Sequence, residues 1–459
     1  MNFDFLHVET MLQYVLDQAR KAGADHAAAI LNKSFESTLR FALNETTQHL
    51  ETCNSTISLA VSIDQREALV QCNDMSPTSL DDLAARAVQF ARLSPPNPEF
   101  FPPVSTPDYP QTQTWFRSTA ELSLDARGDA IRSIFDLAQA RDVNLFGNLA
   151  IEDSTLLVAN TSGLFAHQPY TSATLRVTAR TSESGGSGQN ASSEGDWRLL
   201  DPIKVAERAI DTALMSCNPQ PGTPGRQTVI LSPAATLEYL TMLVFSMDQR
   251  SAELGQSFFS NHDTKGTRIG EKLFGDSVTL RSVYDHPNLP TLGFGSGFGS
   301  GGSSVGKMFS MGLPMTNLMF IENGVVKKLY ESPYWAVRNN REPQALPFNI
   351  VMDGTDSCVE DIILSTPRAV YISSFWYLGL IDPNSVALTG LTRDGTFLIE
   401  DGRITRPLLN FRFNDSPVQS LNHITAIGQA EKAMAEFMIG ITPTLRIEDF
   451  NLSSISGAI

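Results

Sequence analysis

The chain has 459 residues, enough for two or three domains, and its formal net charge is −16. An acidic surface repels phosphate backbones, and the basic residues cluster only in pairs such as Lys327–Lys328, so we expect no direct contact with nucleic acid. No run of about 18 apolar residues is present, so we expect no membrane span.

The spacing of the cysteines and histidines argues against several kinds of metal site. The four cysteines are scattered without a CxxC pair, which argues against a zinc finger and suits a reducing cytoplasm. The amino terminus, MNFDFLHVET, has no basic stretch before an apolar core, so we expect no signal peptide and a cytoplasmic location. The seven histidines form no local ligand pair, and we expect no metal or other cofactor, although a site assembled from distant segments stays open.

The first half of the chain alternates helical and strand-like patterns. Short β-forming runs separated by turn residues predict an antiparallel meander near the amino terminus. Seven prolines in residues 94–112 predict an extended linker that crosses the surface, and the Ser/Gly-rich residues 181–196 predict a mobile loop. The predicted helices are residues 8–22, 80–93, 123–140 and 201–215, and the predicted strands are residues 27–31, 37–41, 55–63, 67–71, 144–152, 154–158 and 173–180.

Residues 232–255 predict the central helix of the second half. Ser232 can cap this helix, and Pro233 suits its first position. Apolar residues cover most of the circumference before the last two turns, so we expect the middle to be buried. The charged end carries Asp248, Arg250 and Glu253, which either project into a cleft or form a solvated helix end.

The remainder of the second half reads as short strands. Asn323-Gly324 and Asp401-Gly402 are hairpin signals. The pattern predicts an α+β protein with two domains: an amino-terminal α/β-meander domain at residues 1–220 and a carboxy-terminal β-rich, barrel- or sandwich-like domain at residues 226–459.

Two further segments allow more than one interpretation. The Gly-rich residues 293–306 contain GxSxG and SxxK patterns at Ser304 and an incomplete phosphate loop, but we expect no helix after them, which favours a flexible loop over catalysis. Arg393 and Asp394 join two predicted strands, where they either pair with each other at a turn or line a cleft in which the guanidinium takes a peptide carboxylate.

Four segments of the second half, taken together, resemble the TldD/PmbA family, whose members are described as modulators of DNA gyrase or as zinc peptidases. They are RSAELGQSFFS (residues 250–260), GTRIGEKLFGDSVTL (residues 266–280), GLPMTNLMFIENGVVKKL (residues 312–329) and FWYLGLIDPNSVALTGLTRDGTFLIEDGRITRPLLNFRFNDSPV (residues 375–418). The first half fits the family more loosely, as helix, meander, helix. The resemblance implies a two-domain fold, dimers, and peptide cleavage inside a closed cavity.

In the zinc-bearing members, an HExxxH helix supplies two histidine ligands and a glutamate base, and a late cysteine supplies a third ligand. The corresponding stretch here, FSMDQRS at residues 245–251, has neither His nor Glu, and residues 434–447 contain no Cys. Ser246, Met247 and Arg250 cannot replace two imidazoles and a thiolate as zinc ligands.

The resemblance therefore implies a metal-free subunit without catalytic residues of its own, which pairs with a zinc-bearing paralogue in a peptide-degrading assembly. Asp248, Arg250, Glu253, Arg393 and Asp394 would line the cavity and orient an extended peptide, which could add to a strand edge. Two alternatives stay open: a stand-alone homodimeric peptide-binding protein, and a serine hydrolase at Ser304.

Overall fold

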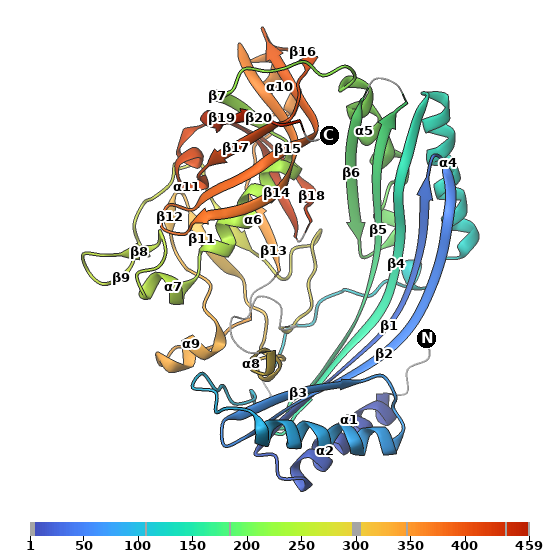
Figure 1. Ribbon diagram of the computed structural model, residues 1–459, viewed down its shortest axis with the longest axis vertical. Coiled ribbons are helices and arrows are strands. Elements are labelled where there is room, and N and C mark those ends of the chain that lie inside the picture. Colours follow the sequence, from blue (N-terminus) through green and yellow to red (C-terminus); the bar gives the residue numbers. More distant parts are fainter. Residues whose placement is uncertain are drawn as a thin grey trace.

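The computed structural model describes residues 5–105, 108–182, 185–295, 304–345, 348–436 and 438–457. Two sheets dominate it (Figure 1): a six-stranded sheet from the first half of the chain and a twelve-stranded sheet from the second. The six-stranded sheet is long and curved, and the second half lies on its concave side (Figure 1). The fold is therefore α+β with a β-rich second half, as predicted. No helix among the described residues is long and apolar enough to cross a membrane.

The six-stranded sheet is antiparallel throughout, in the order β3-β2-β1-β4-β5-β6. Its strands are β1 (His26–Ala42), β2 (Glu45–Ile63), β3 (Arg66–Cys72), β4 (Val143–Asn160), β5 (Phe165–Thr181) and β6 (Ser187–Glu194). The predicted meander is confirmed in β1, β2 and β3. The short predicted runs are parts of much longer strands, because pairing on both sides carries β1 through the polar residues between them.

Helices cover the two ends of this sheet (Figure 1). The pair α1 (Phe5–Lys21) and α2 (Pro77–Leu93) packs on one end, and α4 (Leu124–Ala140) and α5 (Pro202–Met215) pack on the other. The short helices α3 (Arg117–Ala120) and η1 (Trp197–Leu199) contact each other, and α3 also contacts β4 and β5.

The prediction of a mobile loop at residues 181–196 is wrong for most of the described residues, because β6 lies there. Residues 183–184 lie outside the described residues. The small side chains there serve packing against α5. A Cβ added at Gly188 would stand 2.2 Å from the Ala209 carbonyl oxygen, so the Ser/Gly composition reflects close approach of a helix.

The proline-rich segment does more than cross the surface. Phe101 is buried in a core that also contains Phe294 and Phe309 from the second half. The Val104 N–H donates to the Phe309 carbonyl at 3.2 Å, and the Thr112 hydroxyl donates to the Thr291 carbonyl at 2.6 Å. The segment therefore joins the two halves of the chain.

The twelve-stranded sheet is mixed, with a main path β12-β11-β10-β13-β19-β7-β14-β15-β17-β20, to which β16 and β18 add at β15 and β19. The path stays open between its ends, so the second half is sandwich-like and not a closed barrel. Its strands are β7 (Gly225–Leu231), β10 (Leu280–Ser282), β11 (Leu318–Glu322), β12 (Val325–Val326), β13 (Asn349–Met352), β14 (Arg368–Asp382), β15 (Ala387–Glu400), β16 (Arg403–Pro407), β17 (Phe411–Asp415), β18 (Ile424–Met434), β19 (Ile439–Leu452) and β20 (Ser454–Ile455), with β8 (Ser260–Asn261) and β9 (Gly266–Thr267) forming a separate hairpin.

The main core of the second half surrounds α6 (Pro233–Ser246). Ser232 caps this helix, its hydroxyl accepting from the Ala235 N–H at 3.1 Å, as the sequence predicted. The remaining helices are α7 (Gln249–Glu253), α8 (Ser304–Phe309), α9 (Pro333–Arg338), α10 (Val359–Leu364), α11 (Pro417–Ser420) and η2 (Leu421–His423). The boundaries at residues 1–220 and 226–459 stay predictions.

Both predicted hairpin turns are present. Asn323 and Gly324 take φ values of 49° and 79°, and Asp401 and Gly402 take 52° and 74°. Positive φ at both central residues is the requirement of the turn that matches the twist of paired strands.

Candidate functional site

The predicted helix over residues 232–255 is interrupted where the charged residues begin. Helix α6 ends at Ser246, and Asp248 is extended, with φ −96° and ψ 124°. The chain pairs there with Tyr330: the Gln249 N–H donates to the Tyr330 carbonyl at 2.7 Å, and the Tyr330 N–H donates to the Met247 carbonyl at 2.8 Å. This strand-like contact is why the helix stops, and α7 then starts on a new axis.

Asp248 begins α7. Its carboxylate accepts from the Ser251 N–H at 2.7 Å and from the Ser251 hydroxyl at 2.6 Å. This is an N-cap, which satisfies a backbone donor at the start of the helix. The predicted site residue Asp248 is thus occupied in shaping α7.

Arg250 reaches across to the first half of the chain. Its guanidinium donates two hydrogen bonds to the two carboxylate oxygens of Glu99, at 2.9 and 2.5 Å, and lies over the Trp335 ring at 5.1 Å. The hydrogen bonds from Arg250 hold the pKa of Glu99 below its usual value. Arg250 is therefore a contact between α7 and the proline-rich segment.

Glu253, at the end of α7, belongs to a second ion-pair network. It accepts from Arg341 at 3.0 Å and from the Trp335 ring N–H at 2.5 Å, and Arg341 also pairs with Glu331. Burial would raise the pKa of Glu253, but hydrogen bonds from Arg341, Gln249 and Trp335 outweigh burial and lower it. The carboxylate stays charged and fixes α7 against α9.

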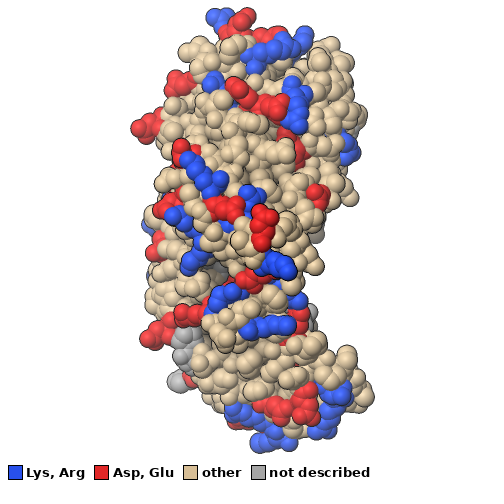
Figure 2. Space-filling view, turned by 90° about the vertical axis from the view of Figure 1, so that its left-hand side faces the viewer, with Lys and Arg blue, Asp and Glu red and all other residues tan. Residues whose placement is uncertain are grey.

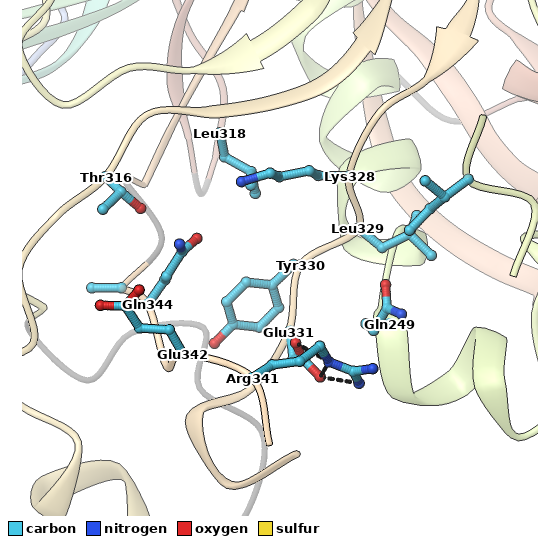
Figure 3. Close-up of a pocket in the computed structure, with 12 residues that line it drawn as sticks. Gln249, Thr316, Leu318, Lys328, Leu329, Tyr330, Glu331, Arg341, Glu342 and Gln344 are labelled. Atoms are coloured by element: carbon cyan, nitrogen blue, oxygen red, sulfur yellow. Dashed lines mark hydrogen bonds and ion pairs between the residues drawn. The ribbon is translucent and has the colours of Figure 1, made fainter. Parts of the chain in front are cut away.

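A pocket of about 300 Å³ opens beside this network (Figure 3). Its wall combines Gln249 of α7 with Tyr330 and Glu331 of the neighbouring strand-like segment and with Arg341. The rest of the lining is Ile269, Thr316, Leu318, Lys328, Leu329, Glu342, Gln344 and Ala345. The helix break at residues 247–248 therefore forms one side of a cavity, and neither the cavity nor its lining was anticipated from the sequence.

Arg393 and Asp394 occupy a different place, on β15. Asp394 has φ 48°, is buried, pairs with Arg393 at 3.4 Å and accepts from the Ser187 hydroxyl of β6. The Arg393 guanidinium lies over the Trp376 ring at 4.2 Å. Among the described residues, no hydrogen bond or ion pair joins Arg393 or Asp394 to α7. Their part in binding a substrate stays a prediction.

Glu238 is a buried acid that sequence reasoning missed. It lies on α6, where its carboxylate accepts from the Phe375 N–H at 2.6 Å. Burial raises the pKa of Glu238 to about 8, and the carboxylates of Glu436 and Asp394 add to the rise. A glutamate on a helix patterned as buried was the only available signal.

The residues that the resemblance puts in place of the family's zinc motif do not fit a zinc ion. The Ser246 hydroxyl donates to the Met242 carbonyl at 2.9 Å, Met247 is fully buried in the core, and Arg250 carries a positive charge. None of the three offers the imidazole, thiolate or carboxylate that zinc requires. Among residues with a described placement, no three His, Cys, Asp or Glu side chains gather as a metal-binding group.

Comparison with known proteins identifies the family of this chain. The model of the PmbA/TldA metallopeptidase C-terminal domain matches residues 224–454, and the model of the corresponding central domain matches residues 110–216. The chain belongs to the TldD/PmbA family. No curated protein sequence matches it.

Solved structures of similar fold agree with this family. TldE from Thermococcus kodakarensis has a TM-score of 0.83 at 18% identity, covering 97% of this chain and 100% of that one. Two candidate modulators of DNA gyrase are also similar: one from Thermotoga maritima (TM-score 0.79, 17% identity, 97% of this chain and 99% of that one) and one from Bacteroides thetaiotaomicron (TM-score 0.83, 15% identity, 99% of this chain and 100% of that one). At such identities the TldD/PmbA fold is what these structures share with the chain.

The serine-hydrolase alternative requires a strand before Ser304 and a helix after the Gly-rich segment, and the structure shows the helix. Helix α8 begins at Ser304, whereas we expected no helix after the Gly-rich segment. The preceding residues 296–303, where the required strand would lie, are outside the described residues. A six-residue helix by itself gives no base to activate a hydroxyl.

The partners of α7 were missed because they are remote in sequence. Glu99 lies 151 residues from Arg250, and Trp335 lies 82 residues from Glu253. A local signal did exist for α9: Ser332-Pro333 repeats the cap of Ser232-Pro233, and the Ser332 hydroxyl accepts from the Trp335 N–H.

Proposed function

We propose that this chain is a metal-free TldD/PmbA subunit that pairs with a zinc-bearing paralogue in a peptide-degrading or peptide-processing assembly. One observation supports the proposal: Arg250, in the segment where the resemblance would put the zinc motif, is held by Glu99 and Trp335. A cation held at that place repels a divalent metal. In this proposal the segment holds α7 against the proline-rich segment and does not bind metal, so catalysis would come from the partner.

A surface on β14 supports the pairing. Trp376, Tyr377, Leu380 and Ile381 are exposed at 43%, 79%, 44% and 57%, and we call them the β14 patch. Tyr377 has φ 57° at a register shift against β15, an unfavourable conformation for an aromatic residue. Apolar side chains exposed together on one strand are typical of a surface that a partner covers.

The same patch would serve a homodimer, so the stand-alone peptide-binding protein is the second candidate. Its assembly would bury the β14 patch against a second copy, in the isologous manner of a two-fold axis. The partner's identity therefore decides between the two functions.

Direct action on DNA is not part of the proposal. On the face in Figure 2, Lys and Arg side chains are interspersed with Asp and Glu. A mixed surface on a chain with net charge −16 gives little attraction for a phosphate backbone. We expect the assembly to act on peptides in the cytoplasm.

The deciding experiment co-expresses the tagged chain with an HExxxH paralogue from the same genome, isolates the complex under native conditions, and measures zinc and peptide cleavage. We expect one zinc per heterodimer and cleavage that requires both chains. Zinc bound to the isolated chain at one equivalent would contradict the metal-free assignment. A clean homodimer that leaves the paralogue behind would favour the second candidate.

A further inference from the structure

The pocket beside α7 holds polar side chains that no other part of the described chain uses. Lys328, Glu342 and Gln344 line it, and their side chains form no hydrogen bond or ion pair with another described residue. By contrast, the lining residues Glu331 and Arg341 pair with each other, as the dashed lines in Figure 3 show. The pocket thus offers one free cation, one free anion and one free amide among its described residues.

Tyr330 supplies a hydrogen-bond donor to the same space. Figure 3 shows its ring extending into the pocket between Lys328 and Glu342. Burial, assisted by the Asp248 carboxylate, raises the pKa of the Tyr330 phenol, so the hydroxyl keeps its proton at neutral pH. Its backbone is fixed by the two hydrogen bonds to Met247 and Gln249, which holds the ring in place.

The volume limits the size of a ligand. About 300 Å³ lies at the lower end of the range for small-molecule pockets. Apolar contacts come from Ile269, Leu318 and Leu329. A small ligand with an apolar body and two opposite charges therefore matches the lining.

We infer that this pocket binds a zwitterionic amino acid or dipeptide, with its carboxylate at Lys328 and its ammonium group at Glu342, beside the Tyr330 hydroxyl. The inference rests on the proposed peptide-processing function, in which such molecules are products. Lys328 supplies a charge-assisted hydrogen bond to the carboxylate. The Tyr330 hydroxyl, whose oxygen lies toward Glu342 in Figure 3, can accept a hydrogen bond from the ammonium group. Glu342 repels a lone carboxylate but attracts an ammonium group, so it selects against simple organic acids. Gln344 can serve a peptide amide, which a dipeptide has and a free amino acid lacks.

Calorimetric titration of the isolated full-length chain tests the inference, with alanyl-leucine, its N-acetyl form, its carboxy-amide form and free leucine as probes. We expect alanyl-leucine to bind, and each capped form to bind at least about tenfold more weakly because one charge is lost. Lys328→Gln should remove the discrimination against the amide, and Glu342→Gln the discrimination against the acetyl form. Comparison of alanyl-leucine with leucine decides between a dipeptide and an amino acid.

Lys327→Gln is the matched control. Lys327 adjoins Lys328 but pairs with Glu322 at 2.9 Å outside the pocket, so its loss should leave binding unchanged. Absence of binding at millimolar ligand, equal binding of free and capped dipeptides, or an equal effect of the two lysine variants would overturn the inference. The proposed function would survive any of these results, because pairing with a zinc-bearing paralogue is measured separately by co-purification.

Discussion

The guanidinium of Arg250 and the carboxylate of Glu99 form a two-bond ion pair across 151 residues of sequence. The pair joins α7, at the edge of the candidate site, to the proline-rich segment from the first half of the chain. Side-chain exposures of 35% and 31% leave it partly screened by solvent. Its position makes it a link between the site and the rest of the fold.

Breaking this pair should destabilise the contact between the two halves. Arg250→Met is expected to lower the free energy of unfolding by about 1 kcal/mol after allowance for solvent screening, with a smaller loss for Glu99→Gln. A double-mutant cycle in urea unfolding measures the coupling. The exposed pair Arg117–Glu121 is the control and should show no measurable coupling. The same result for both pairs would contradict the role assigned to Arg250.

The Arg250–Glu99 coupling should also depend on pH. Because the pKa of Glu99 is lowered in the folded protein, its stabilisation is present above the ordinary value of 4.5 and is lost as the pH falls through the lowered value. Repeating the cycle at acidic pH should therefore show the coupling disappear. Coupling that persists in acid would show that packing on Trp335, and not charge, carries the contact.

Glu238 should make the free energy of unfolding depend on pH in the opposite direction to Glu99. Its pKa of about 8 in the folded state exceeds the ordinary value of 4.5, so the folded protein keeps a proton that the unfolded chain has released between these values. Stability contributed by this group therefore falls as the pH rises through that window. Glu238→Gln should raise the free energy of unfolding by roughly 2–4 kcal/mol near pH 9 and change little near pH 4.

Urea unfolding at both pH values measures the effect of Glu238→Gln. The exposed Glu448, for which Glu448→Gln makes the same change in charge, is the control and should show no such difference. A stability gain that is equal at both pH values would mean that burial of the charge is not its cause.

Asp394 combines a strained backbone with a contact between the halves. Asp394→Asn keeps an acceptor for the Ser187 hydroxyl and tolerates φ 48°, so we expect a small loss of stability. Asp394→Ala loses the acceptor and places a side chain with no local hydrogen bond in the left-handed region, which should cost about 2 kcal/mol. Ser187→Ala removes the hydrogen bond alone and should fall between them in thermal or urea unfolding. If Asp394→Asn were as damaging as Asp394→Ala, the backbone argument would be wrong.

The β14 patch should be needed for assembly and not for folding. Leu380→Ser with Ile381→Ser reduces its apolar area while leaving the strand pairing with β15 intact. We expect the melting temperature to change little and co-purification of the zinc-bearing paralogue to fall at least about tenfold. Leu93→Ser, on a residue 76% exposed at the end of α2, is the control. Undiminished pairing in the double variant would move the interface elsewhere.

Features that act within a few residues could be predicted from the amino-acid sequence alone. Ser232-Pro233 starts α6, and Asn323-Gly324 and Asp401-Gly402 form the predicted turns, because caps and turns depend on local hydrogen bonds and on φ. The α+β class and the TldD/PmbA family were also within reach, since both depend on the order of segments along the chain.

Where those segments meet could be learned only from the folded chain. It ended α6 at Ser246 by pairing Met247 and Gln249 with Tyr330, and it turned the Ser/Gly-rich segment into β6 under α5. It also paired Arg250 with Glu99 and set Arg393 over the Trp376 ring, contacts that the sequence did not predict. The physical reason is that ion pairs, strand pairing and pockets depend on which distant surfaces pack together. The conformational preferences of neighbouring residues do not indicate a partner more than a hundred residues away.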